Sequence, residues 1–533
     1  MQVATSSSRY WVLPLTVIPL ASLWLWHLDA ASPWEYDWSG SVRTDESAYT
    51  MHARTAALTG EYGLDGRPWS WDESTIWPIA GWMARLSFAL TSVGFVGLRL
   101  PSVLFCIVAW VVMGAWCLRS MAFGPAWVPL LLLGLSFPGF VYLRLGNEYG
   151  FILLLTAVAY LLVSEARWAS AWLLAGVLAG IALRARTHCG PAFAGFGVLA
   201  LLDGRPWRRI AALVVGAGVG YGAIWFIYDR PIRSTPEVQI ALRLQLATFY
   251  RLWPHTLLDA WKNFALSPGR TNFFQDSAGL AVLAAAGAWG VVRTRPRQDP
   301  RGWAILASVS AMLIAVGVLH YQPLRYRVFA LIGLALLGGR AFHSHPDERC
   351  GGGFLLGAAF GLGLAWILQG LGAGLPRVAM LAIALALAVA CAALARRPGL
   401  PPWRRRAFLI ACLVAFLLQG AWLFARFHAN PDRDAIRVSR EAAEALHGTG
   451  ARIVGMRTAG TFLYESGIPY FFCWEDLTEE DLRRMAREWR LTHYAVLEQN
   501  DAFPLPKLEP VLRNRRSFPI RNKESLAIYE ITP

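Results

Sequence analysis

Long apolar stretches follow one another along most of the chain, separated by short polar segments. A membrane-spanning helix needs about 20 mainly apolar residues, and the pattern predicts thirteen such spans. The fifth and sixth are short, which leaves open whether they form two helices or one re-entrant unit. The predicted spans centre on residues 11–28, 96–117, 125–143, 149–164, 169–184, 189–202, 209–228, 277–292, 302–319, 327–342, 353–371, 376–395 and 406–425.

The pattern changes after about residue 427, where charged residues become frequent. Segments 434–448 and 478–490 have the spacing of amphipathic helices, and Thr478 is placed as an N-cap. Short apolar runs at 451–456, 493–498 and 525–531 are typical of buried strands. The sequence therefore predicts an all-α polytopic transmembrane domain over 1–426 and a small extracytoplasmic α/β domain over 427–533.

Composition supports a membrane protein and excludes several other classes. Hydrophobic residues make up 56% and charged residues 16%, whereas soluble domains carry about 25% charged residues. The seven cysteines show neither CxxC nor Cys/His spacing, so neither a zinc site nor a disulfide framework is expected. The absence of a GxGxxG or P-loop motif argues against a nucleotide site.

The net charge of +15 is concentrated in short loops between spans. Arginines cluster at 205–209, 293–301 and 396–406, and short basic loops mark the cytoplasmic side. This topology places the N-terminus in the cytoplasm and the C-terminal domain outside. The long loops 29–95 and 229–276 then form an outer active-site face, and no nucleic-acid partner is needed to explain the charge.

Polar groups at five places in the sequence fall on this predicted outer side. Ionisable residues at membrane ends indicate a functional site by default, although single arginines there often serve as lipid anchors. Asp45 could also be only the N-cap of a helix. Arginines beside carboxylates suit an anionic, lipid-linked substrate. The five groups are Asp45/Glu46, Asn147/Glu148, Arg184/Arg186/His188, Arg243–Lys262 and Arg325/Tyr326/Arg327.

Several motifs together resemble the C-type (GT-C) membrane glycosyltransferase superfamily. The chain is similar to the bacterial branch with the lipid A aminoarabinose transferase and the protein O-mannosyltransferases, over roughly the first 340 residues. The order and spacing of the motifs carry the resemblance. They are D-E-x-x-Y (Asp45, Glu46, Tyr49), G-x-P-W (Gly66 to Trp69), RLPS (Arg99 to Ser102), RLGNEYG (Arg144 to Gly150) and PLRYR (Pro323 to Arg327).

The chain also departs from the family pattern. The stretch after G-x-P-W has acids at Asp72 and Glu73 where the family often has a lysine. The family often has Lys-Gly-Pro near the fifth span, whereas here Arg186 and His188 are the basic groups before Gly190. The second acidic motif carries glutamate rather than aspartate.

The resemblance implies an enzyme of the bacterial inner membrane that transfers a sugar from a polyprenyl-phosphate donor. Its acceptor would be a lipid, a glycan or a protein, and direct attack would invert the anomeric carbon. The phosphate is already a good leaving group, so a base matters more than an acid. The implied catalytic residues are Asp45, Glu46 and Glu148, the donor phosphate contacts Arg325, Tyr326, Arg186 and His188, and the sugar or acceptor contacts Tyr49, Trp69 and Trp71.

Two other interpretations remain at this point. A transporter or flippase of lipid-linked sugars would also be polytopic, but such proteins often contain internal repeats, and none is evident. The missing lysine is compatible with an inactive relative of the same fold. Some members of the superfamily use a divalent metal, although the spacing of the acids does not demand one. The sequence does not specify the sugar, the acceptor or the oligomeric state.

Overall fold

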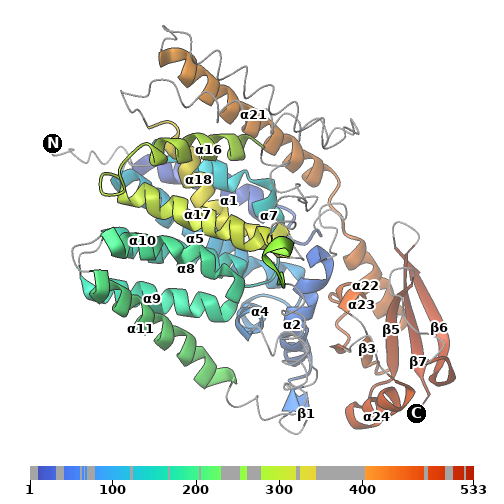
Figure 1. Cartoon of the computed structure of the whole chain (residues 1–533). Coiled ribbons are helices and arrows are strands. Elements are labelled where there is room, and N and C mark those ends of the chain that lie inside the picture. Colours follow the sequence, from blue (N-terminus) through green and yellow to red (C-terminus); the bar gives the residue numbers. More distant parts are fainter. Residues whose placement is uncertain are drawn as a thin grey trace.

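The structure is a computed structural model of the chain, and most of its helices form one bundle (Figure 1). It describes residues 10–31, 41–60, 63–64, 67–68, 78–120, 124–165, 168–202, 206–229, 253–260, 278–319, 324–343, 402–455, 457–472, 478–498, 508–520 and 524–532.

The elements follow one another in this order. The helical part contains α1 (Val12–Leu25), α2 (Ser41–Thr59), β1 (Gly63–Leu64), β2 (Arg67–Pro68), α4 (Pro78–Leu90), α5 (Phe95–Ser120), α6 (Trp127–Gly134), α7 (Phe137–Leu143), α8 (Tyr149–Glu165), α9 (Ala169–Ala185), the 3-10 helix η3 (Thr187–Phe193), α10 (Ala194–Leu202), α11 (Pro206–Ile224), the π-helix η4 (Trp225–Asp229), α16 (Ala278–Val292), α17 (Pro300–Gly317), the 3-10 helix η5 (Leu324–Ala330), α18 (Leu331–Arg340) and α21 (Pro402–Ala429). The C-terminal part contains α22 (Asp434–Ala445), β3 (Ile453–Gly455), α23 (Arg457–Thr461), β4 (Tyr470–Phe472), α24 (Glu479–Trp489), β5 (His493–Glu498), the 3-10 helix η6 (Glu509–Val511), β6 (Leu512–Pro519) and β7 (Ser525–Ile531).

The predicted spans coincide with these helices wherever the chain is described. Spans 353–371 and 376–395 lie outside the described residues. By length and composition, four of the described helical stretches could cross a membrane: Phe95–Ser120, Pro206–Ile227, Pro300–Gly317 and Leu409–Ala429. Shorter apolar helices occupy most of the other predicted positions.

Some predicted spans contain breaks that an apolar pattern does not show. The span at 125–143 is divided into α6 and α7, because Ser136 caps α7 by accepting a hydrogen bond from the amide of Gly139 (3.4 Å). The fifth and sixth spans are two helices, α9 and α10, with η3 between them. The span at 327–342 begins as the 3-10 turn η5 before α18.

A buried aromatic cluster lies where α1, α5 and α7 meet. The rings of Trp24 and Trp110 are 4.8 Å apart in an edge-on arrangement, and Trp24 also contacts Phe140. The indole N–H of Trp24 donates to the carbonyl of Gly134 (2.7 Å), so this tryptophan is buried with its polar atom satisfied. The cluster fixes α1 against the centre of the bundle.

The C-terminal part is a five-stranded mixed sheet with strand order β4-β3-β5-β7-β6. Strand β3 runs parallel to β4 and β5, whereas β7 is antiparallel to β5 and β6. Strand β5 is buried on both faces, because Ala495 and Leu497 join one apolar cluster and Tyr494 and Val496 join the other. The first of these clusters is shared with α2, α4 and α5, so the sheet lies directly against the bundle (Figure 1).

The predicted C-terminal elements are confirmed, with small differences in their ends. Thr478 caps α24 in a capping box with Asp481. The first predicted helix ends at Ala445 rather than at Gly448, which follows with a positive φ of 77°. Strands β4 and β6 and helix α23 were not predicted.

Candidate functional site

Helix α2 carries the first acidic motif and is tied to the bundle by a buried ion pair. Glu46 is 2% exposed and receives two hydrogen bonds from the guanidinium of Arg99 on α5, at 2.6 and 2.8 Å. The amide of Gly146, which precedes α8, donates to the same carboxylate (3.0 Å). Such a bidentate pair fixes direction as well as distance. Glu46 therefore joins α2 to α5 and to the segment that carries the second acidic motif.

The second acidic motif meets the basic segment after α9. Glu148 is fully buried and forms an ion pair with Nε of Arg186. The guanidinium carbon of Arg186 lies 4.2 Å from the ring centre of Tyr49 on α2 and 5.5 Å from that of Tyr149. A cation over aromatic rings is stabilised more strongly when water is excluded. The structure thus brings an acid, a guanidinium and two tyrosines together.

Two 3-10 turns complete this group. Helix α9 ends at Ala185 because Arg186 has an extended backbone, and η3 follows with Pro191 inside it. The ring of His188 on η3 lies 4.0 Å, centre to centre, from that of Tyr326 on η5. It also lies 5.8 Å from the ring of Phe329. These turns place His188 and Tyr326 beside the segment that carries Arg186.

Arg99 of the RLPS motif and Arg144 of the RLGNEYG motif both donate hydrogen bonds to backbone carbonyls. Arg99 Nη1 donates to the carbonyls of Leu28 (2.9 Å) and Ala30 (2.6 Å), and Arg144 Nη2 donates to that of His27 (2.6 Å). These carbonyls belong to the turn after α1, and such groups need partners when they are buried. Both arginines therefore hold the end of α1.

The predicted site residues divide into those the structure brings together and those it does not describe in full. Tyr49, Glu148 and Arg186 are in contact, and His188 is in contact with Tyr326. The other predicted residues are only partly described. Asp45 lies on α2 one turn before Tyr49, and Arg325 lies on η5, but their side chains are outside the described residues, as are Trp69 and Trp71 altogether.

The sequence did not predict that Arg99, the first residue of the RLPS motif, pairs with Glu46. The available signal was an arginine inside an apolar helix, a position that demands a partner. Its partner, Glu46, is a motif residue too, but the sequence did not pair them. Among the described residues, no group of three or more His, Cys, Asp or Glu side chains is arranged to hold a metal ion.

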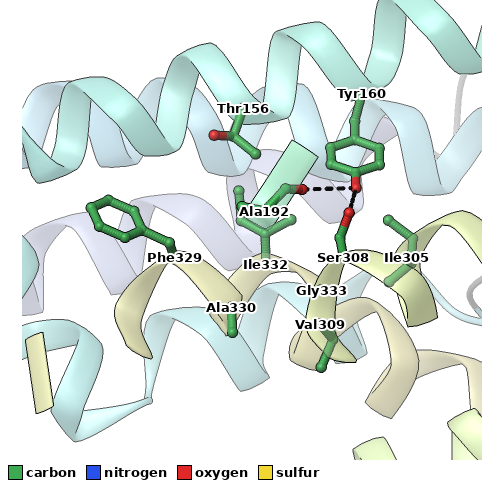
Figure 2. Close-up of a pocket in the computed structure, with 10 residues that line it drawn as sticks. All are labelled: Thr156, Tyr160, Ala192, Ile305, Ser308, Val309, Phe329, Ala330, Ile332 and Gly333. Atoms are coloured by element: carbon green, nitrogen blue, oxygen red, sulfur yellow. Dashed lines mark hydrogen bonds between the residues drawn. The ribbon is translucent and has the colours of Figure 1, made fainter. Parts of the chain in front are cut away.

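A small hollow lies between α8, α17, η5 and α18, close to this group (Figure 2). Two of its hydroxyls bind each other: that of Tyr160 contacts that of Ser308 and also donates to the carbonyl of Ala192 (3.1 Å). The amide of Gly195 donates to Ser308 as well (2.8 Å). The rest of the lining is mostly apolar and includes Phe329. The hollow is thus a packing feature next to the site.

Comparison with known proteins supports the fold. Neither a protein-family model nor a curated protein matches the sequence. The structure is similar to that of ArnT from Cupriavidus metallidurans bound to undecaprenyl phosphate, with a TM-score of 0.54 and 14% identity, over 97% of this chain and 98% of that chain. The apo structure of the same ArnT gives a TM-score of 0.53 at 14% identity, over 98% of each chain.

The match extends over both the helical bundle and the C-terminal sheet, since almost the full length of each chain is covered. The identity is low, so the likeness concerns the arrangement of the elements. The chain therefore has the fold of the GT-C membrane glycosyltransferases.

Proposed function

We propose that the chain is an integral membrane glycosyltransferase that moves a sugar from a polyprenyl-phosphate donor to an acceptor. The fold shared with ArnT supports a membrane enzyme, and one ArnT structure contains undecaprenyl phosphate. The same lipid phosphate is the expected leaving group here. The acceptor would be a lipid, a glycan or a protein.

The observation that carries this proposal is the buried contact of Glu148 with Arg186 beside Tyr49. Arg186 is buried, at 4% exposure. A buried guanidinium is suited to bind a phosphate, because the attraction between opposite charges is stronger where water is excluded. The carboxylate beside it can orient an acceptor hydroxyl. A transferase of this kind needs both groups within reach of one sugar.

The proposed reaction is a single displacement. Asp45 takes the proton of the acceptor hydroxyl while the oxygen attacks the anomeric carbon. The bond from that carbon to the phosphate oxygen breaks, and both of its electrons leave with the polyprenyl phosphate. Attack from the opposite side inverts the configuration. Glu148 orients the acceptor, and Glu46, which is engaged with Arg99, holds α2 in place.

The remaining predicted residues receive supporting roles in this proposal. Arg186 and Arg325 would contact the departing phosphate, with the hydroxyl of Tyr326 and the ring of His188 beside them. Preorganised charge at a leaving group is commonly the largest single contribution to such a rate enhancement. Trp69 and Trp71 would stack against the sugar. None of these assignments requires a cofactor.

The proposed placement in the cell follows from the charge pattern. Residues 1–426 would form the transmembrane domain of a bacterial inner-membrane protein, with the N-terminus in the cytoplasm. Residues 427–533 would form a domain on the outer side. The site would then open on the outer face, at the level of loops 29–95 and 229–276.

The test is transfer by the purified, reconstituted protein from a panel of radiolabelled hexosyl and pentosyl polyprenyl phosphates. Replacement of Asp45 by Asn keeps size but removes basicity. We expect Asp45→Asn to lower turnover by at least about tenfold, with expression and binding of undecaprenyl phosphate retained. Glu441→Gln is the control, because Glu441 lies on α22 and is paired with Arg437.

Unchanged turnover in Asp45→Asn would leave Asp45 as an N-cap only. If wild-type protein moves labelled lipid across the bilayer without any transfer to an acceptor, the protein is a flippase and the proposed reaction is wrong.

A further inference from the structure

Helix α2 has two buried faces with different partners. The face with Glu46 and Tyr49 meets α5 and Arg186. The adjacent face meets the C-terminal part of the chain through side-chain hydroxyls. These hydrogen bonds are Ser47 with Thr461 (2.8 Å), Thr50 with the hydroxyl of Tyr464 (2.8 Å), and Thr55 to the carbonyl of Tyr470 (2.8 Å).

Arg54 is the central residue of this second face. Its guanidinium is fully buried and donates to three backbone carbonyls of the C-terminal part: Tyr464 (2.6 Å), Ile468 (2.9 Å) and Leu463 (3.0 Å). Burial lowers the pKa of Arg54 to about 10, so it remains charged at neutral pH. A buried charge that loses its partners is strongly destabilising. Arg54 thus binds α2 firmly to residues 461–470, which we call the docking segment.

The docking segment also contacts α5. The ring of Tyr464 stacks on that of Phe95 at 5.0 Å, and the carboxylate of Glu465 accepts a hydrogen bond from the amide of Phe95 (2.6 Å). An acid at this place suits the positive end of a helix. Phe95 is in turn connected to α2 through Arg99. The guanidinium of Arg99 lies 4.6 Å from the centre of the Phe95 ring and binds Glu46 of α2. One segment therefore contacts both helices that the Glu46–Arg99 pair joins.

We propose that the docking segment sets the position of α2 relative to α5, and that Arg54 is the positioning residue through which it acts. Arg54 is about two turns of helix from Glu46, and its guanidinium binds the docking segment. Its effect on catalysis rests on the function proposed above. A misplacement of about 1 Å can cost on the order of 10²-fold in rate, so a shift of α2 would be visible in turnover.

The experiment compares two full-length variants in lipid nanodiscs. Arg54→Met removes the guanidinium and keeps an apolar stem. Arg437→Met is the matched control, because Arg437 also donates to a backbone carbonyl, that of Pro519 (2.8 Å), but is exposed and does not touch α2. Hydrogen exchange of amides 46–53, affinity for undecaprenyl phosphate and sugar transfer are measured.

We expect faster exchange in 46–53 for Arg54→Met only, with turnover at least about tenfold lower and unchanged affinity for undecaprenyl phosphate. Lower turnover with unchanged binding of undecaprenyl phosphate would show that α2 is misplaced, because a general loss of structure would weaken binding as well. Arg54→Lys is the second variant if Arg54→Met does not fold. Lysine keeps the charge but lacks the fork that reaches three carbonyls.

Covalent rescue gives the decisive comparison. Ser47→Cys and Thr461→Cys, at two hydroxyls 2.8 Å apart, are introduced together into the Arg54 variant. We expect oxidation to the disulfide to restore slow exchange and turnover, and reduction to abolish both. Among the described residues the native cysteines are buried, which limits competing oxidation.

Three results would overturn the proposal: unchanged exchange in the Arg54 variant, an equal effect in Arg437→Met, or loss of turnover that the disulfide does not restore. If the wild-type protein transfers no sugar, the function proposed above fails. The exchange and disulfide measurements still decide whether the docking segment positions α2.

Discussion

Arg186 is held from two directions by groups of different chemistry. Its Nε is paired with Glu148, while its flat face lies over the ring of Tyr49. A planar guanidinium can satisfy an edge and a face at once, whereas the ammonium of lysine is a compact point charge. The family that the sequence resembles often has lysine near this position, whereas the basic group here is a guanidinium oriented by its neighbours.

At the scale of this residue, we predict that Arg186→Lys weakens binding of undecaprenyl phosphate by about tenfold, which is roughly 1.4 kcal/mol. The shorter reach and lost stacking on Tyr49 are the reasons. Arg209→Lys is the control, because Arg209 also stacks on an aromatic ring, that of Trp172 at 4.7 Å, but belongs to α11. Equal affinities in both variants and the wild type would remove Arg186 from the phosphate site.

Helices α9 and α11 pack with their backbones in close approach, and small residues make this approach feasible. A Cβ atom added at Gly216 of α11 would collide with the carbonyl oxygen of Leu173 on α9, whereas one added at Gly218 would meet nothing within 4 Å. Small residues let helix backbones approach closely in membranes, where van der Waals contact drives association. A side chain is therefore excluded at Gly216 but can be accommodated at Gly218, only two residues away.

At the scale of this helix pair, we predict that Gly216→Ala lowers the free energy of unfolding by about 1–3 kcal/mol. The obstacle is a backbone atom, which cannot rotate away. Gly218→Ala should leave stability equal or slightly higher, because alanine favours a helix more than glycine does. Thermal unfolding in the same detergent measures both. Similar melting temperatures for the two variants would contradict this account of the crossing.

The hydrophobic pattern predicted helices well because a run of apolar residues is sufficient evidence for one. It could not show the break at Ser136, since a cap changes backbone direction without changing hydrophobicity. The interruption near Arg186 did appear, as the gap between the predicted spans 169–184 and 189–202. Strand β6 was missed because its sequence, LRNRRSFP, is largely charged and mostly exposed. Strand β4 spans only Tyr470–Phe472 and is too short to show a pattern.

The candidate site was predictable in part for the same kind of reason. Charge beside predicted span ends selected Glu148 and Arg186, and the D-E-x-x-Y motif of the resemblance selected Tyr49. Arg186 contacts both of the others. The roles of Arg99 and Arg54 were not evident, because their partners are distant in the sequence. A buried arginine requires hydrogen-bond acceptors, but only the fold shows which groups accept its hydrogen bonds.

At the scale of the whole molecule, the sheet and the bundle share one apolar cluster, so the C-terminal part is not a separate appendage. This cluster joins Met51 of α2 and Phe88 of α4 to Ile453 and Leu526 of the sheet. If α2 faces outward, the sheet must be on the same side of the membrane. The proposed topology can therefore be tested at a distance from the site.

We predict that a cysteine introduced at exposed Glu480 on α24 reacts with a membrane-impermeant maleimide in intact cells. A cysteine at Gln298, between α16 and α17, should react only after permeabilisation, because its loop is basic and cytoplasmic in the proposed topology. Unmutated protein is the blank for both. Labelling at Gln298 with protection at Glu480 in intact cells would show that the topology is the reverse of the proposed one.

The contact between α2 and the docking segment also has a consequence for the timing of biosynthesis. Ser47 and Thr461 are 414 residues apart, and translation at about 5–20 residues per second takes roughly 20–80 s to cover that distance. Throughout this time the face of α2 with Arg54 lacks its final partners, while the bundle can already assemble around it. Helix α2 therefore gains its last partners late in synthesis, and a chain that stops before Thr461 lacks the contacts of the docking segment with α2.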